Sequence, residues 1–480
     1  ELLLGTLASY LVGNQALAYG VAVGGFLAAM GLGAYLSRFI AIEDATASLL
    51  KAFAWVELGI APLSALLPLA LFALFVVDGP VWLGLFLVTL LLGTLAGLEV
   101  PLLTRLLEHD EGVRDALAGV LALDYLGALA GSLALPVLLL PTVGMFPSAA
   151  LIGALPALMV FFLGQGFSTL RSQKRWGLGL CAALVALAPL TVPLSDRLEN
   201  TLYNAPVISR IQSPYQRIVL TRQGQDVRMF LDGELQFSTL DEYRYHEALV
   251  HPAMSASNAP QRVLLMGAGD GLALREVLKW PQVKRVLLMD LDPAVVNLGR
   301  HQPFLRQANA DAYKDPRVEV QQADAFLAAP ALSEIFDVII ADFPDPDQAT
   351  LAKLYSQGFY RRLMPRLAPD GVFVTQASSP FFAPRAFACI AATLGSVGLS
   401  THPYTVDVPS FGPWGFVLAQ RSPLQPEMLQ LPITARFLTQ PLLRSLFNLP
   451  ADIPLGDVEI NRLSDPVLVQ YQADPRWAAY

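Results

Sequence analysis

The sequence has few charged residues and only two cysteines, and its basic residues are outnumbered by acidic ones. Only 15% of its 480 residues are charged whereas 54% are hydrophobic, which is far more apolar than a water-soluble enzyme. Cys181 and Cys389 lie far apart in unlike contexts, so neither a disulfide framework nor a zinc cluster is available. A net charge of -8 argues against a nucleic-acid partner and is compatible with a cationic substrate.

The hydrophobic residues are concentrated before residue 195. Most of the apolar runs approach the roughly 20 residues that cross a bilayer core as a helix. The first run lacks the basic start of a cleaved signal peptide. We therefore expect a multi-pass α-helical membrane domain, with the lipid bilayer as a partner, made of seven segments at 1–12, 16–37, 52–77, 81–104, 116–140, 145–164 and 176–194.

From about residue 200 charged residues return, and short apolar runs alternate with helical stretches, as in a βαβ sheet. Residues 215–237 are typical of antiparallel hairpins with turns at Gly224 and Asp232-Gly233. A helix is predicted at 241–254. Strands are predicted at 263–266, 286–289, 318–320, 336–341, 371–376 and 415–419. This pattern indicates a Rossmann-like α/β fold preceded by a small β-hairpin subdomain.

A glycine loop follows the first of these strands. Gly267, Gly269 and Gly271 let the backbone approach a ligand closely, although an ordinary turn explains such a loop as well. Asp290 follows at about the 20-residue spacing at which a carboxylate holds ribose hydroxyls. Asp270 stands where a pyrophosphate would sit, which disfavours a dinucleotide and favours a cationic nucleoside such as an S-adenosyl sulfonium.

Further acids follow the next strands. Asp324 follows the third strand, where it would either hold the adenine amino group or simply cap a helix. Asp342, Asp345 and Asp347 follow the fourth strand, at the edge where such sheets bind ligands. A cluster of acids attracts a polyamine and can accept a proton from an amine. No histidine lies beside them, so we expect no metal.

These segments together resemble the spermidine synthase family of polyamine aminopropyltransferases. The resemblance covers about residues 200–421, in order and spacing, and the hydrophobic first part together with 351–356 resembles its bacterial membrane-integrated subgroup. The segments that carry it are Tyr215-Gln216, 231–236, 241–247, 267–271, 275–278, 342–346 and 414–416.

The resemblance implies a fold, an activity and a set of roles. The fold is that of the S-adenosylmethionine-dependent transferases, and the expected divisions are a membrane domain at 1–195, a β subdomain at 200–240, an aminopropyltransferase domain at 241–421 and a tail or lid at 422–480. Decarboxylated S-adenosylmethionine would be the co-substrate, with no prosthetic group. Donor binding falls to Gln216, His246, Gly267, Gly269, Asp270, Asp290 and Asp324, acceptor binding to Tyr245, Asp345 and Trp414, and catalysis to Asp345 with Asp342 and Tyr245.

The sequence also departs from the family pattern. Ala268 and Leu272 replace common glycines of the loop, Asp290 stands where glutamate is usual, and 343–347 differ around the acidic pair. These departures bear on the identity of the acceptor and should leave donor binding intact. The resemblance implies putrescine or a related amine as the acceptor. Two other functions stay open: an S-adenosylmethionine-dependent methyltransferase, and a polyamine transporter or sensor with a synthase-like regulatory domain. A homo-oligomer is compatible with either.

Sidedness and the membrane acids are the last two expectations. Lys and Arg occupy alternate loops, near 38–51, 105–114 and 171–175, which places these loops in the cytoplasm of a cell-membrane protein. Seven spans would put the following domain outside, away from its donor, so we expect a cytoplasmic domain with 176–194 not fully crossing. Glu57, Glu99 and Asp124 lie in apolar runs and are expected either to line a polar pocket for a cationic amine or to fix helix packing.

Overall fold

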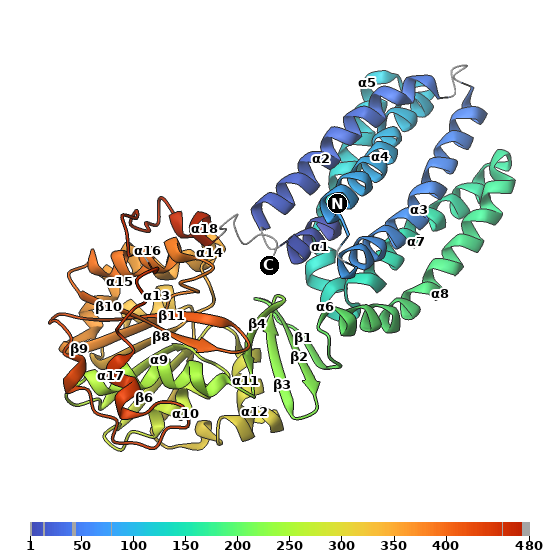
Figure 1. The fold of residues 1–480 in the computed structure, drawn as a ribbon. Helices are drawn as coiled ribbons and strands as arrows, with labels where there is room; N and C mark the ends of the chain where they lie inside the picture. The colour runs from blue at the N-terminus through green and yellow to red at the C-terminus, as the bar shows by residue number, and fades with distance from the viewer. Residues whose placement is uncertain (1, 13–14, 41–44, 78, 454, 473–480) are drawn as a thin grey trace. The chain divides into compact units, whose positions relative to one another are not determined.

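The computed structural model describes residues 2–12, 15–40, 45–77, 79–453 and 455–472. The chain divides into two compact units, Glu1–Val207 and Ile208–Tyr480 (Figure 1). Each unit has its own hydrophobic clusters and is described by itself.

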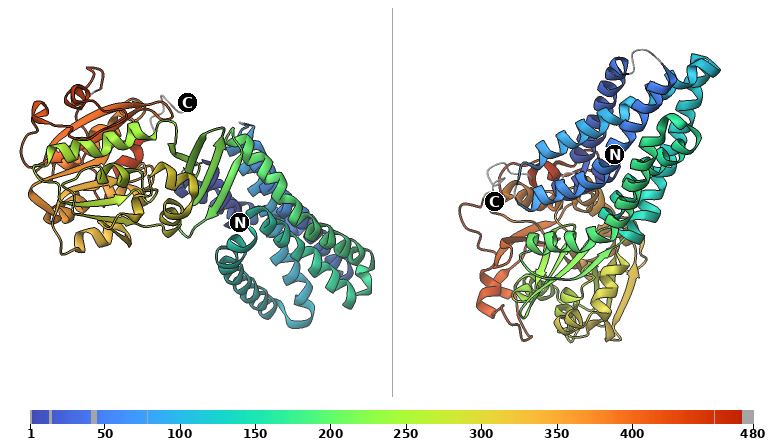
Figure 2. Two further views of the ribbon diagram at one scale, coloured as in Figure 1. Left: turned by 90° about the horizontal axis from the view of Figure 1, so that it is seen from below. Right: turned by 90° about the vertical axis from the view of Figure 1, so that its right-hand side faces the viewer.

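The first unit is helical. Neighbouring helices pack as α2 on α4, α4 on α3, α3 on α7 and α7 on α8, and they run alongside one another in both views of Figure 2. α5 continues through a π-helical turn, Leu135–Leu139, into α6, Leu140–Val143. The other bounds are α1 Leu2–Val12, α2 Gln15–Leu36, α3 Thr46–Val76, α4 Val81–Glu111, α5 Val113–Ala134, α7 Met145–Gly166 and α8 Arg171–Leu202.

Glycines allow a close contact between α2 and α4. A Cβ on Gly33 of α2 would lie 2.0 Å from the Thr94 carbonyl oxygen, and one on Gly97 of α4 would lie 2.1 Å from that of Met30. Small residues at such crossings let two backbones approach, which is how helices associate where no water drives them together.

Six of the described helical stretches are long and apolar enough to cross a membrane, from Ala18–Phe39 to Ser168–Leu202. All seven expected segments coincide with helices, but α1 has only 11 residues. The expected re-entrant run 176–194 lies within one continuous helix, α8, which passes through Pro189 and Pro193 without interruption. A break in this run is therefore not seen, and whether it crosses the membrane fully stays a prediction.

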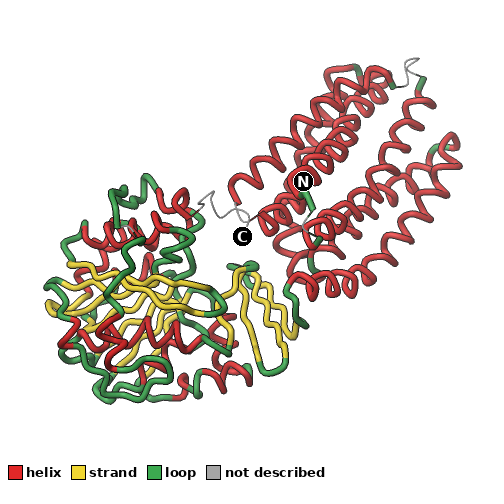
Figure 3. The backbone as a smooth tube through the Cα atoms, viewed as in Figure 1, coloured by secondary structure: helices red, strands yellow, loops and turns green. Residues whose placement is uncertain are grey.

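The second unit is built on a sheet of seven strands in the order β10-β11-β9-β8-β5-β6-β7 (Figure 3). β5 to β9 are parallel, and β10 and β11 form an antiparallel pair at the edge. β10 was missed by the sequence prediction. The bounds are β5 Arg262–Gly267, β6 Arg285–Asp290, β7 Val318–Gln322, β8 Phe336–Asp342, β9 Leu367–Gln376, β10 Ser400–Val408 and β11 Gly412–Gln420.

Alternate residues of each strand face opposite layers of helices, so the sheet is buried on both faces. Leu264, Met266 and Ile339 pack with the helices α13, α15 and α16, whereas Leu265 and Ile340 pack with α9 and α10. The bounds of these and the remaining helices are α9 Glu242–Ala256, α10 Leu272–Leu278, α11 Pro293–His301, α12 Pro303–Ala308, α13 Ala325–Ala331, α14 Ala349–Ala352, α15 Gln357–Leu363, α16 Pro384–Gly395, α17 Gln440–Ser445 and α18 Val467–Gln472.

A second, smaller sheet precedes α9, with strands in the order β1-β2-β3-β4. Ile218, Met229 and Phe237 on one of its faces pack with α10, α11 and α12. The predicted hairpins correspond to β2 to β4, and β1 was missed. The bounds are β1 Val207–Gln212, β2 Arg217–Gln223, β3 Asp226–Leu231 and β4 Glu234–Ser238.

Candidate functional site

The acids expected in the site gather at the carboxyl ends of neighbouring parallel strands. The chain runs outward from β5 to β6 and β7 on one side, then from β8 to β9 on the other, so the strand order reverses between β5 and β8. Ligands of open α/β sheets bind at such a point. Asp270 follows β5, Asp290 ends β6 and Asp342 ends β8, directly beside Gly267 in the register.

The glycine loop needs its glycines. Gly267 has a φ of 78°, and a Cβ there would lie 2.0 Å from the Asp342 carbonyl oxygen. A Cβ on Gly269 would lie 2.6 Å from Oδ2 of Asp290. Neither position accepts a side chain without a shift of its neighbours. The loop therefore approaches the strand ends as closely as a backbone can.

Asp290 is held by backbone amides. Gly269 N–H donates to its Oδ2 at 2.9 Å, and Asp292 N–H donates to its Oδ1 at 2.9 Å. Burial raises the pKa of Asp290 to about 6, against the effect of these hydrogen bonds and with a further contribution from Asp270. Each carboxylate oxygen keeps a lone pair for a hydroxyl donor.

Gln216 reaches this strand end through a residue that the sequence reasoning missed. Its Nε2 donates to Oδ2 of Asp292 at 2.9 Å, and the Ser213 hydroxyl donates to the same oxygen at 2.7 Å. Asp292 also caps α11 by accepting from Ala294 N–H at 2.9 Å. An Asp-Pro pair just after the ribose acid is the signal that could have pointed to it.

A charged triad lies behind the glycine loop. His246 Nδ1 lies 2.9 Å from Oε2 of Glu242, and Arg275 binds both oxygens of the same carboxylate at 2.8 and 2.9 Å. Burial alone would lower the pKa of His246, but the hydrogen bond and charge of Glu242 outweigh it, helped by Asp270 and Asp342, and raise this pKa to about 9. His246 is therefore a cation that faces the acids at neutral pH.

Tyr245 joins the acids to an aromatic wall. Its hydroxyl donates to Oδ1 of Asp342 at 2.6 Å. Its ring centroid lies 6.4 Å from that of Trp414 and 5.2 Å from that of Phe416. Burial raises the pKa of Asp342 to about 6, and Asp270 adds to the shift while His246 opposes it. Trp414 thus lies beside Tyr245, and its role as a wall of an acceptor channel stays a prediction.

Asp345 is held by side chains that the sequence analysis did not single out. Its Oδ1 accepts from the Ser378 hydroxyl at 2.9 Å and from Gln376 Nε2 at 3.1 Å. Gln376 Nε2 also lies 2.7 Å from the Tyr355 hydroxyl. Burial raises the pKa of Asp345 to about 6, against the hydrogen bonds from Ser378 and Gln376. Gln376 ends β9 and Ser378 follows it, and β9 is next to β8 but distant in sequence.

Asp324 caps the helix α13, which was the simpler of its two expected roles. Its Oδ1 accepts from Phe326 N–H at 2.9 Å at the start of α13, and its Oδ2 lies 3.1 Å from Lys353 Nζ. The adenine contact stays a prediction. Asp347 is exposed. In the described ranges no group of three or more His, Cys, Asp or Glu is arranged to hold a metal ion.

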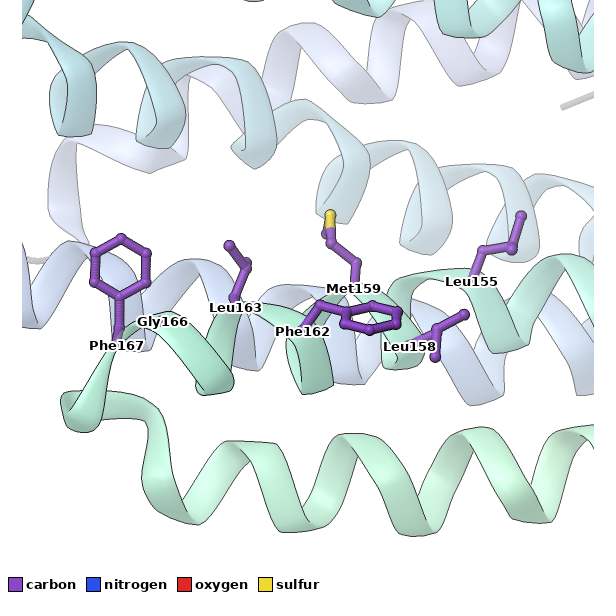
Figure 4. A pocket seen from close by; sticks show the side chains of 7 residues that line it. All are labelled: Leu155, Leu158, Met159, Phe162, Leu163, Gly166 and Phe167. Atoms are coloured by element: carbon purple, nitrogen blue, oxygen red, sulfur yellow. The ribbon is translucent and has the colours of Figure 1, made fainter.

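The acids of the first unit lie on three helices. Glu57 of α3 is buried, Glu99 of α4 is half-buried and Asp124 of α5 is exposed. Each neighbouring pair is near enough for electrostatic repulsion. None of these three acids lines the hollow of about 500 Å³ on one face of α7. Figure 4 shows the side chains that line this hollow. That hollow is apolar and is lined by Leu155, Leu158, Met159, Phe162, Leu163, Gly166 and Phe167.

Comparison with known proteins gives a consistent result. The profile of the spermine/spermidine synthase domain matches residues 242–428. The chain is 42% identical to polyamine aminopropyltransferase 2 of Ralstonia nicotianae, across 98% of this chain and 94% of that protein. It is 38% identical to polyamine aminopropyltransferase of Leptospira interrogans, across 99% and 95%. A spermidine synthase crystallised with the transition-state analogue AdoDATO is 28% identical, covering 51% of this chain and 85% of that one, with a TM-score of 0.48.

The charge of His246 depends on one carboxylate, so Glu242→Gln should lower the pKa of His246 from about 9 toward or below its ordinary 6.5, since burial then dominates. The raised pKa makes the pair stabilising below pH 6.5, and this contribution is lost as the pH rises through 9. Histidine NMR titration measures the shift, and thermal unfolding between pH 6 and 9.5 measures the linkage. Glu319→Gln, on β7, is the control that leaves both unchanged. A His246 pKa that stays near 9 in Glu242→Gln would refute the pairing.

Proposed function

Because the chain belongs to the family of polyamine aminopropyltransferases, we propose that it transfers the aminopropyl group of decarboxylated S-adenosylmethionine to putrescine or a related diamine and releases methylthioadenosine. The observation that carries this proposal is the gathering of acids around the ends of β5 and β8: Asp270 and Asp342 lie at the glycine loop, and both Asp342 and Asp345 act on Tyr245. Both substrates are cations, and the pKa values of Asp342 and Asp345, raised to about 6, leave both groups mostly ionised at neutral pH.

The donor half of the site has the chemistry of a sulfonium nucleoside. Asp290 would accept hydrogen bonds from the ribose hydroxyls, and Asp324 would meet the adenine amino group. Gln216 and His246 would lie near the methylthio and adenosyl parts. Asp270 would pair with the ammonium of the aminopropyl chain, which a methyl donor retaining its carboxylate would not need in the same way.

The acceptor half combines acids with an apolar wall. Tyr245 and Asp345 would hold the two ends of the amine, Trp414 would line its methylene chain, and Asp342 would fix the Tyr245 hydroxyl at 2.6 Å. A diamine has this same division, with two cationic ends and an apolar middle. The side chains at both ends are held by hydrogen bonds within the described residues, which favours one binding geometry.

The reaction is one displacement. The lone pair of the amine nitrogen attacks the carbon next to the sulfonium, a C–N bond forms, and the C–S electron pair returns to sulfur to give neutral methylthioadenosine. An alkyl amine has a pKa of about 10 and is mostly protonated near neutral pH, so a proton must be accepted. We assign that proton to Asp345, because it lies at the amine end and its hydrogen bonds hold it in place.

Two other functions are less well supported. A methyltransferase shares the fold and the ribose acid, but it has no use for three acids at the amine end. A transporter or sensor would need a route for the amine through the helices, and the acids Glu57, Glu99 and Asp124 are the only motif that favours it. If they form a polar pocket, their conversion to amides weakens polyamine binding to the full chain, whereas a packing role leaves it unchanged.

The first test removes the base. Asp345→Asn keeps the size of the side chain and removes its basicity, so methylthioadenosine release should fall by roughly 10²- to 10⁴-fold. Donor affinity should be retained, since the adenosyl contacts are at Asp290 and Asp324. Exposed Asp347→Asn, in the same loop, serves as the matched variant and should keep most activity. Unchanged release in Asp345→Asn would remove the base assignment, and simultaneous loss of donor binding would move Asp345 to the nucleoside site.

The membrane arrangement is also a proposal. Five of the six long helical stretches, those before Ser168, would cross the cell membrane, with the basic loops in the cytoplasm. Because the donor is made in the cell, we place the second unit in the cytoplasm, which requires α8 to lie along the membrane surface. A crossing α8 would instead put this unit on the side opposite the basic loops.

Cysteine labelling decides between these arrangements. In a chain without Cys181 and Cys389, Gln225→Cys beside the Gly224 turn is treated on intact cells with a membrane-impermeant thiol reagent. Ser172→Cys, among the basic residues at the start of α8, is the protected control, and Val77→Cys, just after α3 in a connection without Lys or Arg, is the labelled control. Gln225→Cys should behave like Ser172→Cys and react only after permeabilisation. Labelling on intact cells would mean that α8 crosses and the unit faces outward.

A further inference from the structure

The C-terminal segment Glu459–Gln472 reaches the amine end of the site, although it lies beyond the matched family domain, which ends at residue 428. Asn461 anchors it and is fully buried. Its Nδ2 donates to the Ala352 carbonyl at 2.8 Å, its N–H donates to Thr393 Oγ1 at 3.1 Å, and its carbonyl accepts from Gln357 N–H at 2.9 Å. Three elements of the second unit therefore hold one residue of the tail.

α18 continues this attachment to its last residue. Val467, Leu468 and Tyr471 are buried in the same cluster as α16. The guanidinium carbon of Arg385 lies 4.0 Å from the centroid of the Tyr471 ring. The helix is thus packed on the same face of the sheet as α16, and the position of Gln472 is set by apolar burial.

Gln472 starts a hydrogen-bond relay that ends on the proposed base. Its Nε2 donates to Ser378 Oγ at 2.8 Å, and the Ser378 hydroxyl donates to Asp345 Oδ1 at 2.9 Å. A serine hydroxyl has one hydrogen, so accepting from the amide commits that hydrogen to the carboxylate. Bonds in such a chain polarise one another and strengthen the last one.

The backbone of Ser378 is shaped for this role. Its φ is 59°, a left-handed conformation that residues other than glycine rarely adopt. Gln376 Oε1 accepts from Ser378 N–H at 2.8 Å, and Gly415 N–H donates to the Ser378 carbonyl at 2.8 Å. Strain of this kind persists where the surroundings impose it, and here it brings the hydroxyl between Gln472 and Asp345.

We propose that Gln472 is a positioning residue of the transfer reaction: through Ser378 it engages Oδ1 of Asp345 and leaves Oδ2 to receive the proton of the attacking amine. The proposal rests on the proposed function of Asp345. In the part of the chain that the structure describes, the hydrogen bonds of Ser378 and Gln376 to this carboxylate both fall on Oδ1. The tail would therefore belong to the catalytic apparatus of this chain and not only to its packing.

The relay has a consequence for pH dependence. Burial raises the pKa of Asp345, whereas the hydrogen bonds from Ser378 and Gln376 and the nearby amide of Gln472 favour its ionised form and lower this pKa. Their loss raises that pKa, so a larger share of the base is protonated on the acidic side. The titratable groups that face Asp345 are Glu234, Asp347, Tyr245 and Tyr355, and the substitutions below leave all four in place.

The test compares Gln472→Met with Gln470→Met, an exposed position of the same helix, in the purified full chain. For each, kcat/KM for the diamine is measured from pH 5.5 to 9 and divided by the parent value at the same pH, which cancels the titration of the amine itself. For Gln472→Met this ratio should be about three- to tenfold below 1 at the acidic end and return toward 1 at pH 9. For Gln470→Met it should stay near 1 throughout.

Ser378→Ala and the double variant test the order of the relay. Ser378→Ala should give a pH-dependent loss at least as large, and adding Gln472→Met should lower the ratio by less than it does in the parent, since the first link has lost its target. If Gln472→Met does not fold, Gln472→Glu replaces it. It cannot donate to Ser378 when ionised and adds a negative charge, so its acidic loss should be larger.

Several outcomes would overturn the relay. They are a ratio for Gln472→Met that is reduced equally at all pH values, a ratio that stays at 1, or losses that multiply in the double variant. Asp345→Asn is measured in the same series to separate the two proposals. If Asp345→Asn is impaired while the ratio for Gln472→Met is flat, the relay alone fails. If Asp345→Asn is as active as the parent, the base assignment fails first.

Discussion

The burial of neighbouring carboxyl groups, together with the repulsion between them, is the constraint around which the second unit is built. Parallel strands that end side by side bring Asp270, Asp290 and Asp342 to one edge of the sheet, and burial there makes each negative charge costly. The protein binds more protons in this crevice than the unfolded chain does between pH 3.8 and about 6. Stability from these groups therefore falls as the pH rises through that window. A bound cation would pair with these carboxylates and restore the stability that their ionisation removes.

The surrounding residues limit this repulsion without removing it. Backbone amides hold Asp290, the Tyr245 hydroxyl holds Asp342, and the cation of His246 faces the acids from behind. His246 is itself held by Glu242, which Arg275 binds through both oxygens. Since Arg275 and Glu242 compensate one another, His246 is the one cation of the triad left to oppose the acids. The site therefore stays negative, which is the charge that a sulfonium and a diamine require.

Much of this arrangement could be predicted from the sequence. The family and its fold followed from the order and spacing of the motifs, and the relatives confirm the family. The strands β5 to β9 were visible as apolar runs, because a parallel sheet buries both faces. β1 and β10 were missed because they are edge strands of mixed polarity. α8 is one continuous helix that accommodates Pro189 and Pro193, and whether it crosses the membrane stays a prediction.

The side chains that hold the site could not be predicted in the same way. Ser378 and Gln376 meet Asp345 only because β9 lies beside β8, and Gln472 meets Ser378 across 94 positions of sequence. No local pattern encodes such a contact. Asp292 was missed for a different reason, since a residue that caps a helix also serves as the partner of Gln216.

Proton release on donor binding measures the repulsion directly. Decarboxylated S-adenosylmethionine is titrated calorimetrically into the full chain between pH 5.5 and 7.5, in buffers of different ionisation enthalpy, with neutral methylthioadenosine as the matched ligand. The cation should lower the raised pKa values of the acids, so protons should be released near pH 6 and affinity should rise with pH. Binding of methylthioadenosine should release fewer protons, because this ligand carries no positive charge. Equal proton release by both ligands, or an affinity for the cation that does not change with pH, would contradict a site organised by unpaired carboxylates.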